Sequence, residues 1–120
     1  MKVSEAINLA DKYAGSPIES ELKYRWLQQI EDIIYKEVIL THKEPPPQPA
    51  PVLRYDRELL CPEPYSELYI HYLNAQNDLM HRDTRSFENS ASAFATAFSS
   101  FADWYNRTHS PQSYAERIDI

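Results

Sequence analysis

The sequence is poor in glycine and cysteine, and each shortage removes a class of function. Gly15 is the only glycine in 120 residues, so the glycine-rich loops that cradle phosphate groups cannot be built. Cys61 is the only cysteine, which rules out an intramolecular disulfide and fits a reducing compartment. No apolar run reaches the length of a membrane span. A signal peptide has a continuous apolar core, whereas Glu5, Asn8 and Asp11 interrupt the apolar residues at this N-terminus. We therefore expect no nucleotide cofactor and no membrane partner.

Positive charge is also scarce. Twelve Lys and Arg stand against 18 Asp and Glu, which gives a net charge of -6 and an isoelectric point near 5.1. The basic residues are scattered along the chain, so we expect no sequence-specific binding of nucleic acid. One alternative is still compatible with this composition: an acidic wall that nucleic acid passes without binding to it. The length suits one domain with one modest core.

The apolar spacing predicts a single domain, residues 1–120, with an all-α fold of four helices in a small bundle. Residues 1–41 hold the first two helices. The first covers residues 4–13. The second begins with a capping box at 16–19 or later, at Ser20, and ends near Thr41. Its apolar residues form two rows, and two rows imply two packing neighbours, so we expect this helix in the middle of the bundle.

Residues 42–62 are expected to form an extended arm, because five prolines between Pro45 and Pro51 fix the backbone and prevent a helix. Residues 52–60 fit either a short strand or a continuation of the arm. Proline-rich segments also bind SH3 domains, but a rigid loop or arm is the favoured interpretation.

Residues 63–109 are predicted to form a long helical hairpin, followed by a free or docking tail at 110–120. Pro64 would open the third helix, which ends at His81, and the fourth helix covers 84–107. One apolar stripe runs along the fourth helix, and we expect it to be core: Phe87, Ala91, Phe94, Phe98, Phe101 and Tyr105.

The fourth helix has no charged residue between Glu88 and Asp103, although a helix that faces water normally carries charge. Small residues beside the stripe would let a second backbone approach closely, which indicates an interface with another subunit. The predicted interface comprises the helix flank, the arm and the tail: Ala93, Ala97, Ser100, Trp104, Pro46, Pro49, Tyr55 and Tyr114.

Catalytic and metal-binding patterns are weak. Glu67, His71, Asn74 and Asp78 line up on one side of the third helix, but one helix supplies at most two usable ligands. A solvated polar face is the favoured interpretation. We therefore predict no metal and no enzymatic activity, and an enzyme with a helix-borne metal site remains the minor alternative.

Three blocks of sequence carry a resemblance to a known family. They are Lys-Tyr-Arg-Trp-Leu-Gln-Gln-Ile at 23–30, Glu-Leu-Leu-Cys-Pro-Glu-Pro-Tyr-Ser-Glu-Leu-Tyr-Ile-His-Tyr-Leu-Asn-Ala-Gln-Asn-Asp at 58–78, and Phe-Ala-Asp-Trp-Tyr-Asn-Arg-Thr-His at 101–109. Together they resemble small helical head–tail connector proteins, also called adaptor or head-completion proteins, of phages and prophages of Gram-positive bacteria. The proline-rich segment is longer and denser in proline than is usual in that family.

The resemblance implies a structural virion protein without catalytic residues. Its copies would form a homo-oligomeric ring, twelvefold on the portal protein, in the virion neck. The ring would offer a docking surface to a tail or stopper protein and a passage to DNA. The alternative is a cytoplasmic helical regulatory protein that binds another protein.

Overall fold

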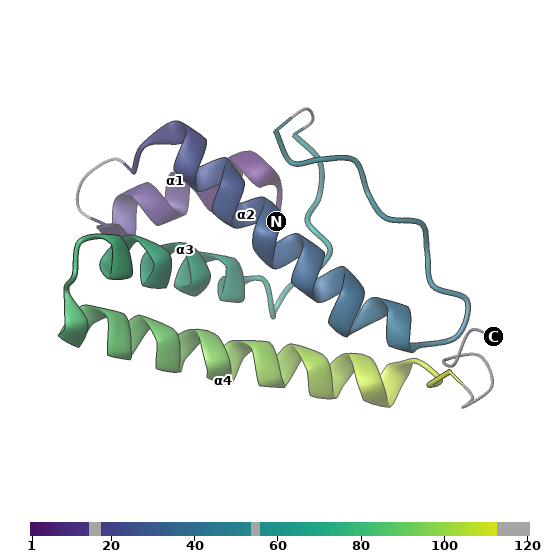
Figure 1. Ribbon diagram of the computed structural model, residues 1–120. Helices are drawn as coiled ribbons and strands as arrows, with labels where there is room; N and C mark the ends of the chain where they lie inside the picture. The colour runs from purple at the N-terminus through teal and green to yellow at the C-terminus, as the bar shows by residue number, and fades with distance from the viewer. Residues whose placement is uncertain (15–17, 54–55, 113–120) are drawn as a thin grey trace.

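The computed structural model describes residues 1–14, 18–53 and 56–112, which contain four α-helices and no strand (Figure 1). The helices are α1 (Val3–Ala14), α2 (Ser20–Glu37), α3 (Glu67–Met80) and α4 (Thr84–Thr108), with a short 3-10 turn, η1 (Ile39–Thr41), after α2. The predicted all-α fold with four helices is confirmed.

The centre of the bundle is α3, not α2 as the sequence had suggested. α3 contacts α1, α2 and α4, and it lies between the α1–α2 pair and α4 in Figure 1. Its buried residues accordingly lie on more than one side of the helix: Leu68, Tyr69, Ile70, Leu73 and Ala75.

Helix ends follow local hydrogen bonds that periodicity does not reveal. α2 begins at Ser20, where the Glu19 side chain accepts a hydrogen bond from the Glu21 amide, and the predicted capping box falls partly outside the described residues. α2 ends at Glu37, because the chain tightens into η1 before Thr41. α3 begins at Glu67 rather than at Pro64, since the Tyr65 amide donates to the Pro62 carbonyl and closes a separate turn first.

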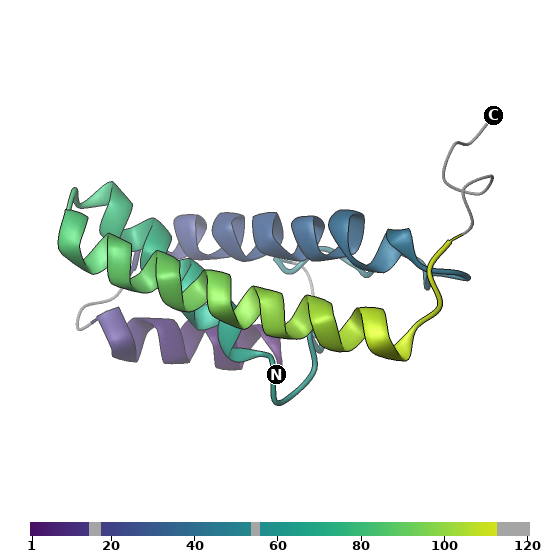
Figure 2. The ribbon, with the colours of Figure 1, turned by 90° about the horizontal axis from the view of Figure 1, so that it is seen from below.

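A tight turn reverses the chain between α3 and α4. Arg82 has a left-handed backbone (φ of 56°), and Asp83 caps α4 by accepting hydrogen bonds from the Ser86 amide and hydroxyl. α4 has 25 residues and α3 has 14, so α4 is about 37 Å long and α3 about 21 Å. The second half of α4 therefore extends well beyond α3 (Figure 2).

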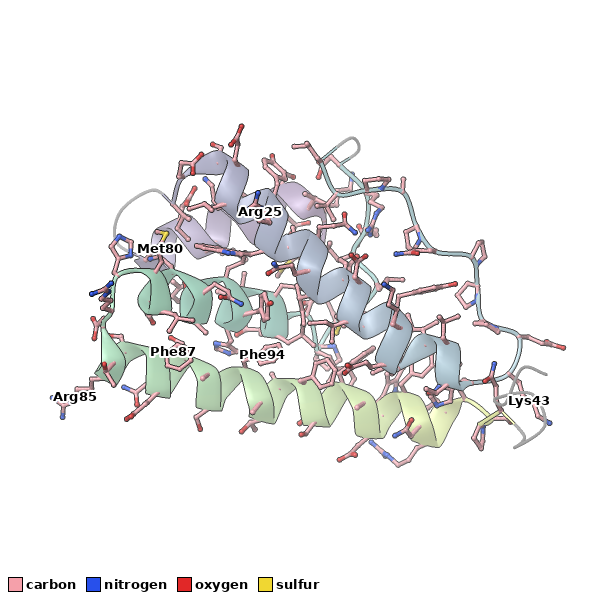
Figure 3. All side chains as sticks on the ribbon, viewed as in Figure 1. Arg25, Lys43, Met80, Arg85, Phe87 and Phe94 are labelled. Atoms are coloured by element: carbon pink, nitrogen blue, oxygen red, sulfur yellow. The ribbon has the colours of Figure 1, made fainter. Side chains whose placement is uncertain are left out.

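The phenylalanine stripe of α4 is only partly core. Phe101 is the only buried residue of α4, whereas Phe87, Phe94 and Phe98 are half-buried. Figure 3 shows Phe87 and Phe94 on the side of α4 that faces α3. The prediction that the whole stripe is core was wrong in degree, because only Phe101 is fully buried, and the ring of Tyr65, which precedes α3, lies beside it.

The proline-rich segment lies along α2 instead of protruding from the bundle. The Tyr35 hydroxyl donates to the Pro46 carbonyl (2.7 Å), the Gln48 amide to the Asp32 carboxylate (3.0 Å), and the Val52 amide to the Gln28 side chain (2.9 Å). Val52 is buried in the core. Hydrogen bonds to side chains of α2 therefore hold residues 46–52 on the bundle as a rigid loop, and the alternative of an arm that leaves the bundle is wrong for these residues.

Residues 57–59 join the bundle through the N-terminus. The Val3 amide donates to the Arg57 carbonyl (3.0 Å), and the Leu59 amide donates to the Met1 carbonyl (2.9 Å). This pairing makes an isolated bridge between Lys2 and Glu58, so the possible strand in this part of the chain is a single bridge.

Candidate interaction surface

The exposed side of α4 is neutral over most of its length. Between Glu88 and Asp103 the exposed residues are Asn89, Ser92, Ala95, Thr96, Ser99 and Ser100. None of them carries a charge, so the solvent-exposed side of α4 consists of small, uncharged side chains over this stretch. We call this set the neutral face of α4.

The predicted interface residues of α4 divide between this face and the core. Ser100 is exposed on the neutral face, and Ala93 is half-buried. Ala97 and Trp104 are half-buried and pack against the core cluster of the same chain. Part of the predicted interface is therefore buried within the subunit itself. The sequence pattern could not distinguish such an internal contact from a contact with another subunit.

The predicted interface residues of the arm and tail do not join the neutral face. Pro46 is exposed and Pro49 is half-buried, both in the segment that lies across α2 from α4 (Figure 1). Tyr55 and Tyr114 lie outside the described residues. The structure thus shows no single patch that combines α4 with the proline-rich segment.

The C-terminal end of α4 carries an aromatic cluster that the sequence reasoning missed. Its members are Tyr65, Phe101, Trp104, Tyr105, His42 and His109. Tyr105 and His109 stack in parallel at 3.7 Å between ring centres, and the buried His42 meets Tyr105 edge-on at 4.7 Å. The His42 Nδ1 lies 2.6 Å from the Val38 carbonyl, so it carries a proton and donates. The sequence does contain one signal of this cluster: His42 follows Val38, the last residue of an apolar row of α2.

Backbone pairing holds the chain that follows α4. The Lys43 amide donates to the Ser110 carbonyl (2.9 Å), and the Gln112 amide donates to the Thr41 carbonyl (3.0 Å). The end of α4 consequently lies beside the end of α2 (Figure 2). Of the two alternatives for the tail, free or docking, residues 110–112 follow the second, since their backbone groups pair with Thr41 and Lys43.

A buried carboxylate, also missed at the sequence level, joins three parts of the chain. Glu31 of α2 is 2% exposed. It accepts hydrogen bonds from Arg57 Nη1 (2.7 Å), the Tyr69 hydroxyl (2.6 Å) and the Leu60 amide (3.2 Å). The Tyr69 oxygen in turn accepts from the Cys61 amide (2.8 Å). Buried charge is stable only when paired and hydrogen-bonded, and here α2, residues 57–61 and α3 all supply partners.

Burial and this carboxylate also set the chemistry of the neighbouring groups. Burial, together with the nearby charge of Glu31, raises the pKa of the Cys61 thiol far above its ordinary value. The same two causes raise the pKa of the Tyr69 hydroxyl. Both groups therefore stay protonated at neutral pH, and Cys61 lacks the thiolate that a nucleophile or metal ligand requires.

A polar hollow lies at the α3–α4 turn, beside the end of α1. It is lined by Tyr13, Ala14, Asn74, Asp78, Asp83, Ser86, Asn89 and Ser90. Asp78 accepts from the Ser90 hydroxyl (2.8 Å), and the hydrogen bonds from Ser86 lower the pKa of Asp83. The hollow is open and its two carboxylates already have hydrogen-bond partners.

The structure splits the four residues that were weighed as metal ligands. His71 Nε2 lies 4.0 Å from the Glu67 carboxylate, away from the polar hollow that Asn74 and Asp78 line. Within residues 1–14, 18–53 and 56–112, no three His, Cys, Asp or Glu side chains gather as a metal site.

An apolar groove lies between the first half of α2 and residues 51–53. Its volume is about 570 Å³, and it is lined by Glu21, Leu22, Tyr24, Arg25, Gln28, Pro51, Val52 and Leu53. Leu53 is 72% exposed, the most exposed large apolar side chain among the described residues. Sequence reasoning missed this groove because it forms only when the proline-rich segment returns to α2.

None of the helices described here has both the length and the apolar character that crossing a membrane requires. Comparison with known proteins finds no matching family model, no matching curated protein and no matching solved structure.

Proposed function

We propose that this chain is a structural subunit of a phage head–tail connector, which forms a ring on the portal protein in the virion neck. The observation that carries the proposal is the neutral face of α4. A helix of Ser, Thr, Ala and Asn side chains without charge allows close packing of a neighbouring backbone at little desolvation cost. The resemblance of residues 23–30, 58–78 and 101–109 to connector proteins supplies the particular assembly.

The acidic character of the chain fits this role. A net charge of -6 lets DNA pass through the ring without adhering to its wall. The ring is twelvefold on the portal, and it presents a second surface to a tail or stopper protein. No catalysis and no cofactor are needed for any of these contacts.

A neutral face of small side chains gives a weak contact between free subunits, because it buries little apolar area. The portal would raise the local concentration of subunits and place them side by side, so that weak contacts suffice for a closed ring. We therefore expect the neutral face to join subunits on the portal template under conditions in which this face alone joins few free subunits.

The test is a charge placed on the neutral face. Ser100→Arg adds bulk and an unpaired charge at an exposed position, which leaves the subunit folded and blocks a close neighbour. Ala97 is a poorer choice because it packs against the core. Asn106→Arg is the matched control, since Asn106 is exposed on the same helix beyond the neutral stretch.

Each protein is mixed with purified portal, and the complexes are viewed by electron microscopy. Rings should form on the portal with the parent and with Asn106→Arg, and they should be lost with Ser100→Arg. Equal assembly of all three would remove α4 from the interface. Absence of any portal complex with the parent would refute the connector proposal.

The alternative is a cytoplasmic helical regulatory protein that binds another protein. It is favoured by the packing of Ala97, Phe98 and Trp104 against the core of their own chain, which completes the subunit without a neighbour. This alternative predicts a chain that neither binds portal nor forms rings.

A further inference from the structure

We propose that the groove between α2 and residues 51–53 binds the C-terminal segment, residues 113–120, of a second copy of the chain. The inference adds a second contact between subunits to the proposed ring. It rests on the proposed function only in assuming that the same contact joins each copy to the next. It is independent of the portal.

The groove lies on one side of α2. The proline-rich segment of the same chain covers the rest of that side and leaves this end uncovered. Glu21, Arg25, Gln28, Asp32 and Tyr35 follow one another at steps of four and three along one side of α2. The second half of this row binds residues 46–52 through three hydrogen bonds. The first half, up to Gln28, forms the groove and has no such cover among the described residues.

The groove has a fixed outer wall and an apolar lining. The hydrogen bond from the Val52 amide to Gln28 and the burial of Val52 hold its outer wall against α2. Its volume of about 570 Å³ lies within the range of about 300–1,000 Å³ that is typical of ligand pockets. Leu22 and Leu53 supply apolar surface, and Arg25 supplies a positive charge at the rim.

The sequence of residues 113–120, Ser-Tyr-Ala-Glu-Arg-Ile-Asp-Ile, complements this lining. In an extended chain, side chains two residues apart lie on the same side, which places Ile118 and Ile120 together. These two side chains can bury apolar surface against Leu53 and its neighbours. Glu116 falls on the same side as these two residues, and its charge complements that of Arg25, which gives the contact a direction.

The position of Gln112 decides whose segment fills the groove. Its amide donates to the Thr41 carbonyl, so the described chain ends beside the C-terminal end of α2, about 20 Å along the helix from Gln28. Residues 113–120 in extended form reach about 26–29 Å. However, the direct path along this row of α2 is occupied by residues 46–52.

Figure 3 shows the separation between the two ends of α2: Arg25 lies at one end and Lys43, which pairs with Ser110, at the other. A copy's own segment would have to pass around the proline-rich chain, whereas the segment of a neighbour approaches freely. The contact is therefore head-to-tail, and such contacts close into rings when the rotation between copies allows it.

The first experiment measures binding of the segment itself. A fluorescent peptide of residues 112–120 is titrated into full-length protein carrying Ile118→Asp and Ile120→Asp, whose own segment no longer competes. We expect saturable binding that weakens at least tenfold when Arg25→Glu and Leu53→Asp are added. Both positions are exposed, so these changes spare the fold, which circular dichroism checks.

A matched control carries Lys36→Glu and Leu79→Asp, which make the same changes at exposed positions outside the groove. This control should bind the peptide as the unmodified receptor does. No binding, or equal loss in the control and the groove variant, would overturn the proposal.

The second experiment tests head-to-tail association by sedimentation velocity, without portal. The parent should associate, while the Ile118/Ile120 variant and the Arg25/Leu53 variant should each remain monomeric. Their equimolar mixture should give dimers that grow no further, since each pair holds one intact groove and one intact segment. Ser113→Asp with Ala115→Asp is the matched control in the segment and should associate like the parent.

A parent that stays monomeric at concentrations that saturate the peptide site would overturn the second copy as the occupant and indicate docking within one chain. Because both measurements omit the portal, the groove contact and the connector role can fail separately.

Discussion

Replacing Glu31 tests whether the buried carboxylate holds the fold together. Glu31→Ala leaves the Tyr69 hydroxyl and the Leu60 amide without their acceptor. It also removes the ion pair of the Arg57 guanidinium, which keeps its hydrogen bonds to the Ala50 and Glu58 carbonyls. Removal of one partner from a buried pair costs about 3–5 kcal/mol, and an orphaned buried donor costs about 1–3 kcal/mol. The Arg57 side chain is 15% exposed and can recover some hydration, so we expect a total cost of about 3–5 kcal/mol.

That cost is a large share of the stability of a small domain, which is about 5–15 kcal/mol in total. It is measured by urea unfolding followed by far-ultraviolet circular dichroism, with the slope of the transition compared between variants. Asp32→Ala is the matched control, because Asp32 is the next residue of α2 and, among the described residues, accepts hydrogen bonds only from Gln28 and Gln48 near the surface. Its cost should be below about 1 kcal/mol.

A double variant separates lost charge pairing from lost packing. Glu31→Met with Arg57→Met removes both charges, so no uncompensated ion is left inside, and its cost should be smaller than that of Glu31→Ala alone. If Glu31→Ala unfolded at the same urea concentration as Asp32→Ala, the carboxylate would not be a structural centre and the reasoning would fail.

Two further predictions concern stability. Burial alone would raise the pKa of Asp11, but hydrogen bonds from Lys23 and the Ile18 amide outweigh it and lower the pKa below the ordinary 3.8. The stability from this contact is therefore present above about pH 4 and lost as the pH falls through the lowered value, so Asp11→Asn should cost about 1–3 kcal/mol at pH 7 and progressively less in acid, as urea midpoints across pH would show. Phe101→Ala should cost about 3–5 kcal/mol because Phe101 is fully buried, and Phe98→Ala should cost clearly less because it is half-buried; equal midpoints in urea would contradict this order.

Periodicity was sufficient for the helices and insufficient for what lies between them. The apolar spacing of α2 and α4 follows from the geometry of one helix, so each could be read from a short window of sequence. The extent of burial could not, because it depends on which distant segments of the chain pack against each position of the stripe. Phe98 and Phe101 share one stripe, yet only Phe101 is fully covered.

The polar contacts were beyond prediction for a different reason. Glu31 meets Arg57 and Tyr69, which are 26 and 38 residues away, and no local pattern encodes such a distance. The proline-rich segment posed the same difficulty, since its path depends on the Tyr35 hydroxyl finding the Pro46 carbonyl. Glu31 falls between Leu27 and Ile34 in a buried apolar row, and this position was the only sequence signal of the network.

The overhang of α4 beyond α3 also gives the protein a built-in optical reporter. The chain has two tryptophans: Trp26 lies in the core on α2, and Trp104 lies on the overhanging part of α4, 5.3 Å from the Tyr65 ring. With Trp26 replaced by Phe, the remaining indole emission comes from the part of α4 that extends beyond α3. Undocking of this helix end would then be visible as a red shift in fluorescence while the helical signal in circular dichroism stays unchanged.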